Sequence, residues 1–110
     1  MFDQGEIVVV PFPFSDLTGV KQRPVLVLSK RLENNLGEDI IVCGITSNLK
    51  DSKYSVPLGN ENLENGLIPA KSKIKVDKLF TLDKKIVKKR VARINKKTFS
   101  LVVDVFKNLV

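Results

Sequence analysis

The run Val25-Leu26-Val27-Leu28 constrains the fold of this chain more than any other stretch. It is short, β-branched at alternate positions and bounded by turn residues, which favours a buried β-strand over a helix. Pro24 has no N–H to give to a ladder, so we expect it at the first position of a strand over residues 24–30. Arg23 then lies at the mouth of this strand, where its guanidinium suits a phosphate group or an ordinary surface ion pair.

The sequence pattern predicts several other strands joined by turns. Residues 6–12 and 39–46 are apolar runs, and residues 54–58 alternate like an edge strand that Pro57 marks. Further strands are expected over residues 67–76 and 86–94, and the stretch from Ser72 to Asp77 alternates strictly between polar and apolar residues. Turns or loops are expected over residues 13–22, 31–38, 59–66 and 81–85. Hairpin-like connections of this kind predict antiparallel pairing.

The hydrophobic period changes after Asn95. An apolar stripe with helical spacing follows, made by Phe99, Val102, Val103, Phe106 and Val110. Asn95 is a suitable N-cap, and the valines are poor helix formers, so packing against the sheet must hold this helix. Additional apolar positions at Leu101, Val105 and Leu109 indicate either a dimer contact or a wider core. The predicted fold class is mainly β, a small bent antiparallel barrel closed by a C-terminal helix.

Composition limits the chemistry of the chain. Its 110 residues predict one domain, and the single cysteine, Cys43, is expected to be a buried packing residue. The sequence has no histidine, which removes the usual acid–base group near neutral pH and the commonest transition-metal ligand. We therefore expect no metal site and no cofactor. The chain has neither a leader-like N-terminus nor an apolar run of the ~20 residues that span a bilayer, so we expect a cytoplasmic protein without a membrane partner.

The net charge of +7 is concentrated in the second half of the chain, where residues 56–110 hold 13 of the 19 Lys and Arg residues. Such an excess favours a polyanionic partner or an acidic protein segment, although lysines also serve only to keep exposed faces solvated.

In this order, the motifs resemble those of the MazF/PemK family of toxin endoribonucleases. The matching features are Gly5-Glu6-Ile7-Val8, a Pro-Phe followed by Asp16 and Thr18-Gly19, the strand Arg23 to Ser29, the strand end Ile45-Thr46-Ser47, and Ile74 to Leu79. The resemblance runs from about Gly5 to Leu82 and implies one toxin domain over residues 1–110, with an SH3-like barrel that forms a homodimer.

The resemblance also implies a function. Such a protein is the toxin of a type II toxin–antitoxin system, a metal-independent, sequence-specific endoribonuclease that cleaves single-stranded RNA by attack of a 2′-hydroxyl on the adjacent phosphate. In the family the positions of Arg23 and Thr46 carry catalysis, and Asp77 matches an acidic position that acts as base or RNA contact. Each of these two residues also has a purely structural alternative. Thr46 could be a strand residue that is hydrogen-bonded only to the backbone, and Asp77 could form an ion pair with Lys75 or Lys78.

We expect RNA to be bound by residues on the two connections that flank this site and on the nearby strands. These residues are Phe14, Thr18, Lys21, Ser47, Tyr54 and Lys75, with Phe14 and Tyr54 as the only exposed aromatic side chains near the site. Lys75 stands where some relatives have a second arginine, and lysine is the weaker bidentate phosphate ligand. The implied protein partner is an antitoxin whose acidic segment covers the basic groove.

Two other functions stay open at this point. A module of the same shape could bind nucleic acid without cutting it. A toxin that poisons gyrase shares the barrel, but those relatives act through a tryptophan near the C-terminus, and this chain has no tryptophan.

Overall fold

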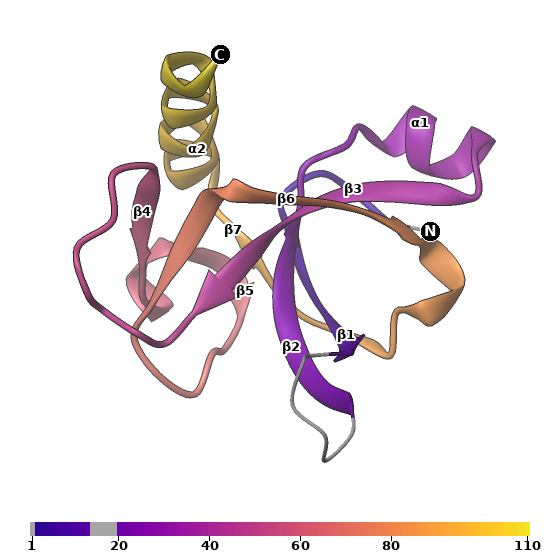
Figure 1. The fold of residues 1–110 in the computed structure, drawn as a ribbon, viewed down its shortest axis with the longest axis horizontal. Helices are drawn as coiled ribbons and strands as arrows, with labels where there is room; N and C mark the ends of the chain where they lie inside the picture. The colour runs from indigo at the N-terminus through magenta and orange to yellow at the C-terminus, as the bar shows by residue number, and fades with distance from the viewer. Residues whose placement is uncertain (1, 14–19) are drawn as a thin grey trace.

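The computed structural model describes residues 2–13 and 20–110 (Figure 1). Their elements in chain order are β1 (Glu6–Pro13), β2 (Val20–Val27), α1 (Arg31–Leu36), β3 (Asp39–Thr46), β4 (Ser55–Leu58), η1 (Asn60–Asn62), β5 (Leu63–Gly66), β6 (Ser72–Asp83), η2 (Lys84–Ile86), β7 (Lys89–Ile94) and α2 (Lys96–Leu109). Within these ranges, no helix has the length and apolarity needed to cross a membrane.

The strands form one antiparallel sheet in the order β4-β6-β3-β2-β1-β7-β5. Strand β1 pairs with both β2 and β7, so an early and a late part of the chain lie side by side. The sheet curls strongly, and α2 stands beside one end of it (Figure 1). This arrangement confirms the predicted class, a bent antiparallel sheet with a C-terminal helix, and it confirms β4 as an edge strand.

The middle of the sheet is buried on both faces, which explains why its strands are continuous apolar runs. Successive residues of a strand point to opposite faces. Leu26 and Cys43 belong to one buried cluster, and the adjacent Val25 and Val42 belong to the other. Cys43 is therefore the buried packing residue that the sequence predicts.

Strand β2 corrects one prediction, because it begins at Val20 and places Pro24 inside the strand. Pro24 lies opposite Val9 of β1, whereas the ladder with β3 begins only at Val25. A proline is tolerated here because β2 has no ladder pair on its β3 side at this position.

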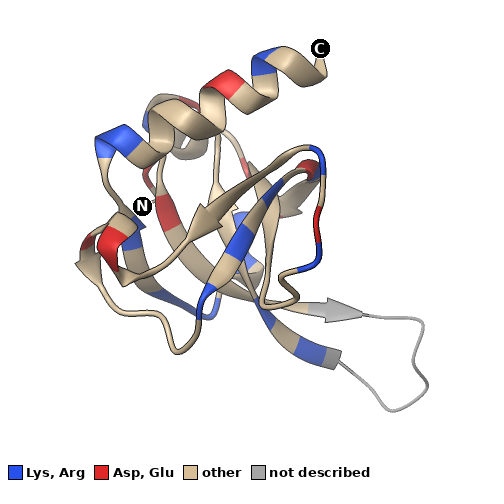
Figure 2. Ribbon diagram, turned by 90° about the vertical axis from the view of Figure 1, so that its left-hand side faces the viewer, with Lys and Arg blue, Asp and Glu red and all other residues tan. Residues whose placement is uncertain are grey.

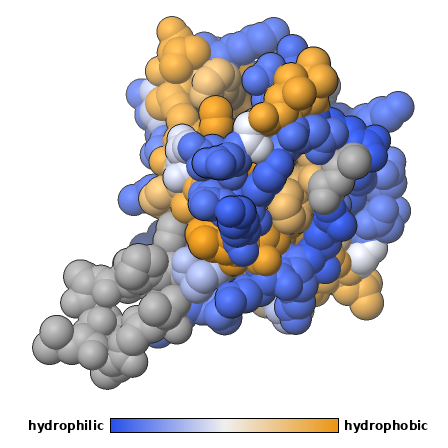
Figure 3. All heavy atoms as spheres, turned by 90° about the vertical axis from the view of Figure 1, so that its right-hand side faces the viewer, coloured by the Kyte–Doolittle hydropathy of each residue, from blue (hydrophilic) through white to orange (hydrophobic). Residues whose placement is uncertain are grey.

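Three predicted turns also contain regular structure. Residues 31–38 include α1, residues 59–66 include η1 and β5, and β6 continues to Asp83 through a predicted turn. Pairing of β5 with β7 and of β6 with β3 stabilises these strands across the sheet, so local turn residues did not reveal them. Figure 3 views the side on which α1 lies and shows hydrophobic residues among hydrophilic ones.

Helix α2 begins as predicted. The Asn95 side chain caps it by accepting a hydrogen bond from the Thr98 N–H at 2.8 Å. Val102 is fully buried, and Phe99 and Val105 pack against the same cluster. Leu101, in contrast, is 46% exposed, so the wide apolar stripe belongs partly to the core and partly to the surface.

Candidate functional site

A cleft opens where β2 and β3 separate. Their ladder ends at the pair Val25–Gly44, although β2 extends back to Val20 and β3 continues to Thr46. Pro24 has no N–H with which to prolong the ladder. Figure 1 shows the end of β3 turning away from β2. The cleft has a volume of about 320 Å³ and is lined by Arg23, Pro24, Gly44, Ile45, Thr46, Lys75, Lys78 and Phe80.

Arg23 and Thr46, which the sequence predicts as catalytic, both line this cleft and are both half-buried. The Thr46 hydroxyl oxygen accepts a hydrogen bond from the Asn48 N–H at 3.1 Å, which holds the side chain in place. A hydroxyl that accepts one bond still carries its own proton, which it can donate to a phosphate oxygen. The cleft thus combines a guanidinium and an oriented hydroxyl.

Strand β6 supplies two ammonium groups to the cleft. Lys75 lies opposite Gly44 in the β3–β6 ladder, but Cys43 pairs with Leu79, so residues 76–78 form a bulge without pairs on β3. Lys78 lines the cleft together with Lys75. The strict alternation read from the sequence missed Lys78 because a bulge shifts which side chains share a face.

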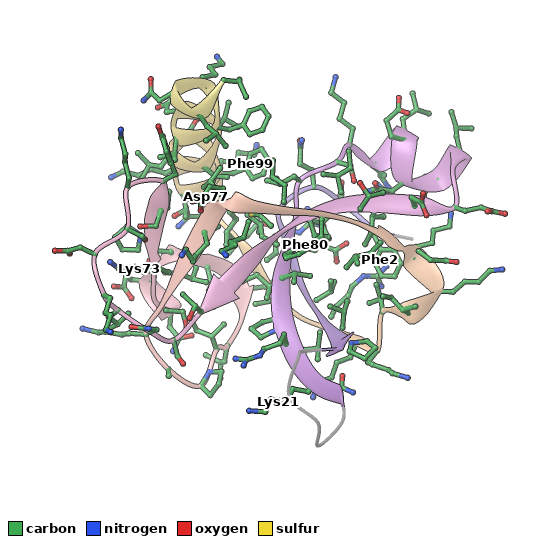
Figure 4. All side chains as sticks on the ribbon, in the orientation of Figure 1. Phe2, Lys21, Lys73, Asp77, Phe80 and Phe99 are labelled. Carbon is green, nitrogen blue, oxygen red and sulfur yellow. The ribbon has the colours of Figure 1, made fainter. Side chains whose placement is uncertain are left out.

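Asp77 lies on this bulge and is exposed, but it does not line the cleft. Figure 4 places it toward α2, whereas Phe80 lies over the middle of the sheet. The structure therefore brings Arg23, Thr46 and Lys75 together and leaves Asp77 apart from them.

Phe80 corrects the expectation that Phe14 and Tyr54 are the only exposed aromatic residues near the site. It is 36% exposed and lines the cleft. The apolar pair Leu79-Phe80, which breaks the alternation of β6, was the sequence signal for it. Tyr54 is half-buried beside β4, where Lys53 Nζ lies 5.4 Å from its ring centre, and it is not a cleft residue. Phe14 lies outside the described residues.

The other predicted RNA contacts are dispersed. Lys21 is exposed near the start of β2, away from Phe80 (Figure 4). Ser47 is exposed and lines a second cavity, which also touches Arg23. Thr18 belongs to the segment 14–19 that the structure does not describe.

The charge of the cleft is positive. Arg23, Lys75 and Lys78 line it, and no Asp or Glu is among its described lining residues. Figure 2 shows further Lys and Arg segments along the strands, with acidic segments between them. A site with three cations and a hydroxyl is suited to hold a phosphate and to stabilise negative charge that develops on it.

Comparisons with solved structures agree with this fold. The MazE–MazF complex (Form-III) from Deinococcus radiodurans has a TM-score of 0.80 at 22% identity, over 98% of this chain and 94% of that chain. An endoribonuclease in complex with its cognate antitoxin from a mycobacterial species has a TM-score of 0.78 at 16% identity, over 98% and 93%. The Mycobacterium tuberculosis toxin MazF-mt6 has a TM-score of 0.75 at 17% identity, over 94% and 93%.

Sequence comparisons place the chain in a family. A comparison with curated proteins finds no significant match. The profile described as the PemK-like, MazF-like toxin of type II toxin–antitoxin systems, however, matches residues 3–110, nearly the whole chain. The protein therefore belongs to the PemK-like, MazF-like family of type II toxins.

Proposed function

We propose that this toxin is a metal-independent endoribonuclease that cleaves single-stranded RNA in the cytoplasm. One observation carries the proposal: Arg23, Thr46 and Lys75, which stand far apart in the sequence, line one positively charged cleft. The solved structures of similar fold include proteins named as endoribonucleases, which supports the same reaction here.

The cleft contains groups that would stabilise the negative charge developed in this reaction. The 2′-oxygen bonds to phosphorus while the bond to the 5′-oxygen breaks, which yields a cyclic 2′,3′-phosphate and a 5′-hydroxyl end. Arg23 donates hydrogen bonds to the phosphoryl oxygens, where negative charge increases in the transition state. Thr46 holds the same phosphate through its hydroxyl, and the ammonium groups of Lys75 and Lys78 add to the positive field.

Two proton transfers complete the reaction. The 2′-hydroxyl loses a proton to a base, and the leaving 5′-oxygen gains one. Because Asp77 lies outside the cleft, we assign it to contact with RNA beyond the scissile phosphate rather than to the base. Arg23 is the cleft residue best placed to hydrogen-bond the leaving oxygen.

The proposed protein partners are an antitoxin and a second copy of the toxin. The similar structures include complexes with an antitoxin, and an acidic segment would complement the cations of the cleft. An apolar groove of about 420 Å³ between α2 and the sheet, lined in part by Phe106, Ile41 and Leu79, supports a homodimer. All three side chains are more than one-third exposed, which is costly for a face that stays in water.

The decisive experiment is incubation of a long, unstructured RNA with the purified protein in the presence of a chelator, followed by mapping of the new ends. We expect cuts at a short recurring motif with 5′-hydroxyl ends. Arg23→Ala removes a donor to the transition state and should lower the rate by roughly 10²–10³. Arg31→Ala on α1 is the control, because it removes the same charge at an exposed arginine outside the cleft.

A second function is a nucleic-acid-binding module that does not cut. The observation in its favour is Lys75, a lysine where some family members have arginine. Salt-sensitive binding of RNA without new ends, at enzyme concentrations well above those of the RNA, would establish that function instead of the nuclease.

A further inference from the structure

A second cavity adjoins the cleft at the point where β2 and β3 separate. It has a volume of about 410 Å³ and shares Arg23, Pro24 and Ile45 with the cleft. Alternation along β2 and β3 directs neighbouring side chains to opposite faces of the sheet. The shared residues therefore lie at a boundary, with the proposed phosphate site on one side and the second cavity on the other.

The inner surface of this cavity is apolar, and its polar groups are few. Ile7 is fully buried there, and Val9 and Val91 extend the same apolar surface. Ser47 and Lys89, both exposed, are among its polar lining residues. An apolar pocket with a few hydroxyl and ammonium groups fits a flat ligand that has apolar faces and polar edges.

The outer wall is the segment Leu67 to Ala70, and hydrogen bonds hold it in place. The Asn60 side chain accepts a bond from the Ile68 N–H at 2.9 Å and donates one to the Ile68 carbonyl at 3.4 Å. The Ser72 hydroxyl donates to the Ala70 carbonyl at 3.0 Å. The pocket is thus formed before any ligand enters, which lowers the entropic cost of binding.

Two cations lie on opposite sides of the pocket. Val9 pairs with Pro24 of β2 on one side and with Lys89 of β7 on the other. Two strand spacings, about 9–10 Å, therefore separate the backbone beside Arg23 from that of Lys89. Arg23 is placed to hold the phosphate at the cleft, and Lys89 to hold a neighbouring phosphate of the same RNA chain.

We propose that this pocket receives the nucleobase next to the scissile phosphate and thereby sets one position of the cleavage motif. The inference rests on the proposed function in taking RNA as the ligand, but it concerns binding and not the chemical step. The Ser47 hydroxyl can donate and accept, and the Ser72 hydroxyl, whose proton is donated to the Ala70 carbonyl, can still accept, so the two can read the polar edge of a base. The adjacent apolar residues contact its faces.

The test measures the equilibrium affinity of the protein for a set of RNA oligonucleotides, each of which lacks one base. All of them carry a 2′-deoxy sugar at the cut position, which removes the attacking hydroxyl and so prevents cleavage. Removing the base that enters the pocket should weaken binding by roughly tenfold, because burial of a base against aliphatic side chains contributes about this much. Ala70→Leu fills the pocket from its exposed wall. We expect the intact RNA to lose roughly tenfold in affinity and the penalty for the missing base to disappear.

Controls separate this effect from loss of structure. Asn65→Leu adds similar apolar bulk at an exposed residue of β5 outside the pocket and should keep the wild-type profile. Ala70→Ser hardly fills the pocket and should also keep the wild-type binding profile. If Ala70→Leu does not fold, Ala70→Val takes its place. An Ala70→Leu profile identical to wild type would overturn the pocket assignment even if the toxin cuts RNA. Conversely, if the protein cuts nothing, the same oligonucleotides are used without the 2′-deoxy sugar. A penalty for one missing base that disappears in Ala70→Leu would then refute the nuclease and retain the pocket as a base-binding site.

Discussion

Arg23 and Thr46 occupy equivalent positions on neighbouring antiparallel strands, each two residues beyond the Val25–Gly44 pair that ends the β2–β3 ladder. Beyond that pair the strands separate, and both side chains line the cleft between them. The same break in pairing therefore accounts for the opening and for the two residues that occupy it. Pro24, immediately before the last pair, cannot donate to the ladder and so favours the separation.

Thr46→Val should lower the rate of RNA cleavage by roughly 10²–10³, the usual effect of removing one donor to a developing anion. Valine keeps the shape of threonine but can neither donate to phosphate nor accept the 3.1 Å bond from the Asn48 N–H. Thr46→Ser keeps the hydroxyl and should stay within about tenfold of wild type by the same reasoning. Single-turnover cleavage of a short RNA measures both. Equal rates for Val and Ser variants would exclude a role for the hydroxyl.

Lys78→Ala should weaken RNA binding, because the cleft loses one cation that can contact a phosphate. The slope of log K against log salt concentration should become shallower by about 1, since about one fewer counterion is released.

Asp77→Asn, at the adjacent position outside the cleft, should leave the cleavage rate nearly unchanged. Titrations at several salt concentrations and cleavage rates over a range of pH measure these effects. Loss of activity in Asp77→Asn together with a changed pH profile would restore Asp77 as the base.

Much of the fold could be predicted because the strands are buried on both faces. Residues 39–46 were predicted without error, since Ile40, Val42 and Cys43 leave no polar alternation to misread. The edge strand β5 could not be predicted from Leu63-Glu64-Asn65-Gly66. It has no apolar pattern and is a strand because it pairs with β7.

The candidate site was predictable to a smaller extent. Arg23 precedes one apolar run and Thr46 ends another. Their match to the motifs of one family predicted that both belong to the same site. Lys78 and Phe80 were missed because the bulge at residues 76–78 changes the face to which β6 directs its side chains. No local pattern marks such a bulge, which depends on the partner strand.

Asn95→Ala should lower the free energy of unfolding by about 1 kcal/mol, the typical effect of losing an N-cap. The Asn95 side chain accepts the Thr98 N–H at 2.8 Å, and Thr98 is buried, so water does not easily replace that bond. Asn95→Asp keeps an acceptor and should restore most of the loss. Urea unfolding followed by circular dichroism gives the values. A matched substitution at exposed Lys97, Lys97→Ala, should change stability by only a few tenths of a kcal/mol.

Cys43 makes stability depend on alkaline pH. Burial raises the pKa of its thiol from the ordinary value of 9.0 to about 12. Above pH 9 the unfolded chain therefore releases a proton that the folded chain keeps, so unfolding becomes easier as pH rises. This thiol's contribution is constant below pH 9 and declines above it, by up to about 1.4 kcal/mol per pH unit, until the folded thiol also ionises near pH 12.

Comparison of wild type with Cys43→Ala isolates this contribution, because Cys43 is the one ionisable group in which the two proteins differ. The alanine variant should be less stable at pH 8, since it leaves a small cavity in the buried cluster to which Leu26 and Ile74 also belong. Its free energy of unfolding should nevertheless fall less steeply between pH 9 and pH 10.5, so the two curves approach each other. The native thiol should also resist alkylation by iodoacetamide until urea unfolds the chain, because the neutral, buried thiol is not a nucleophile. Parallel stability curves, together with rapid alkylation of the native protein at pH 9, would mean that the thiol ionises within the fold.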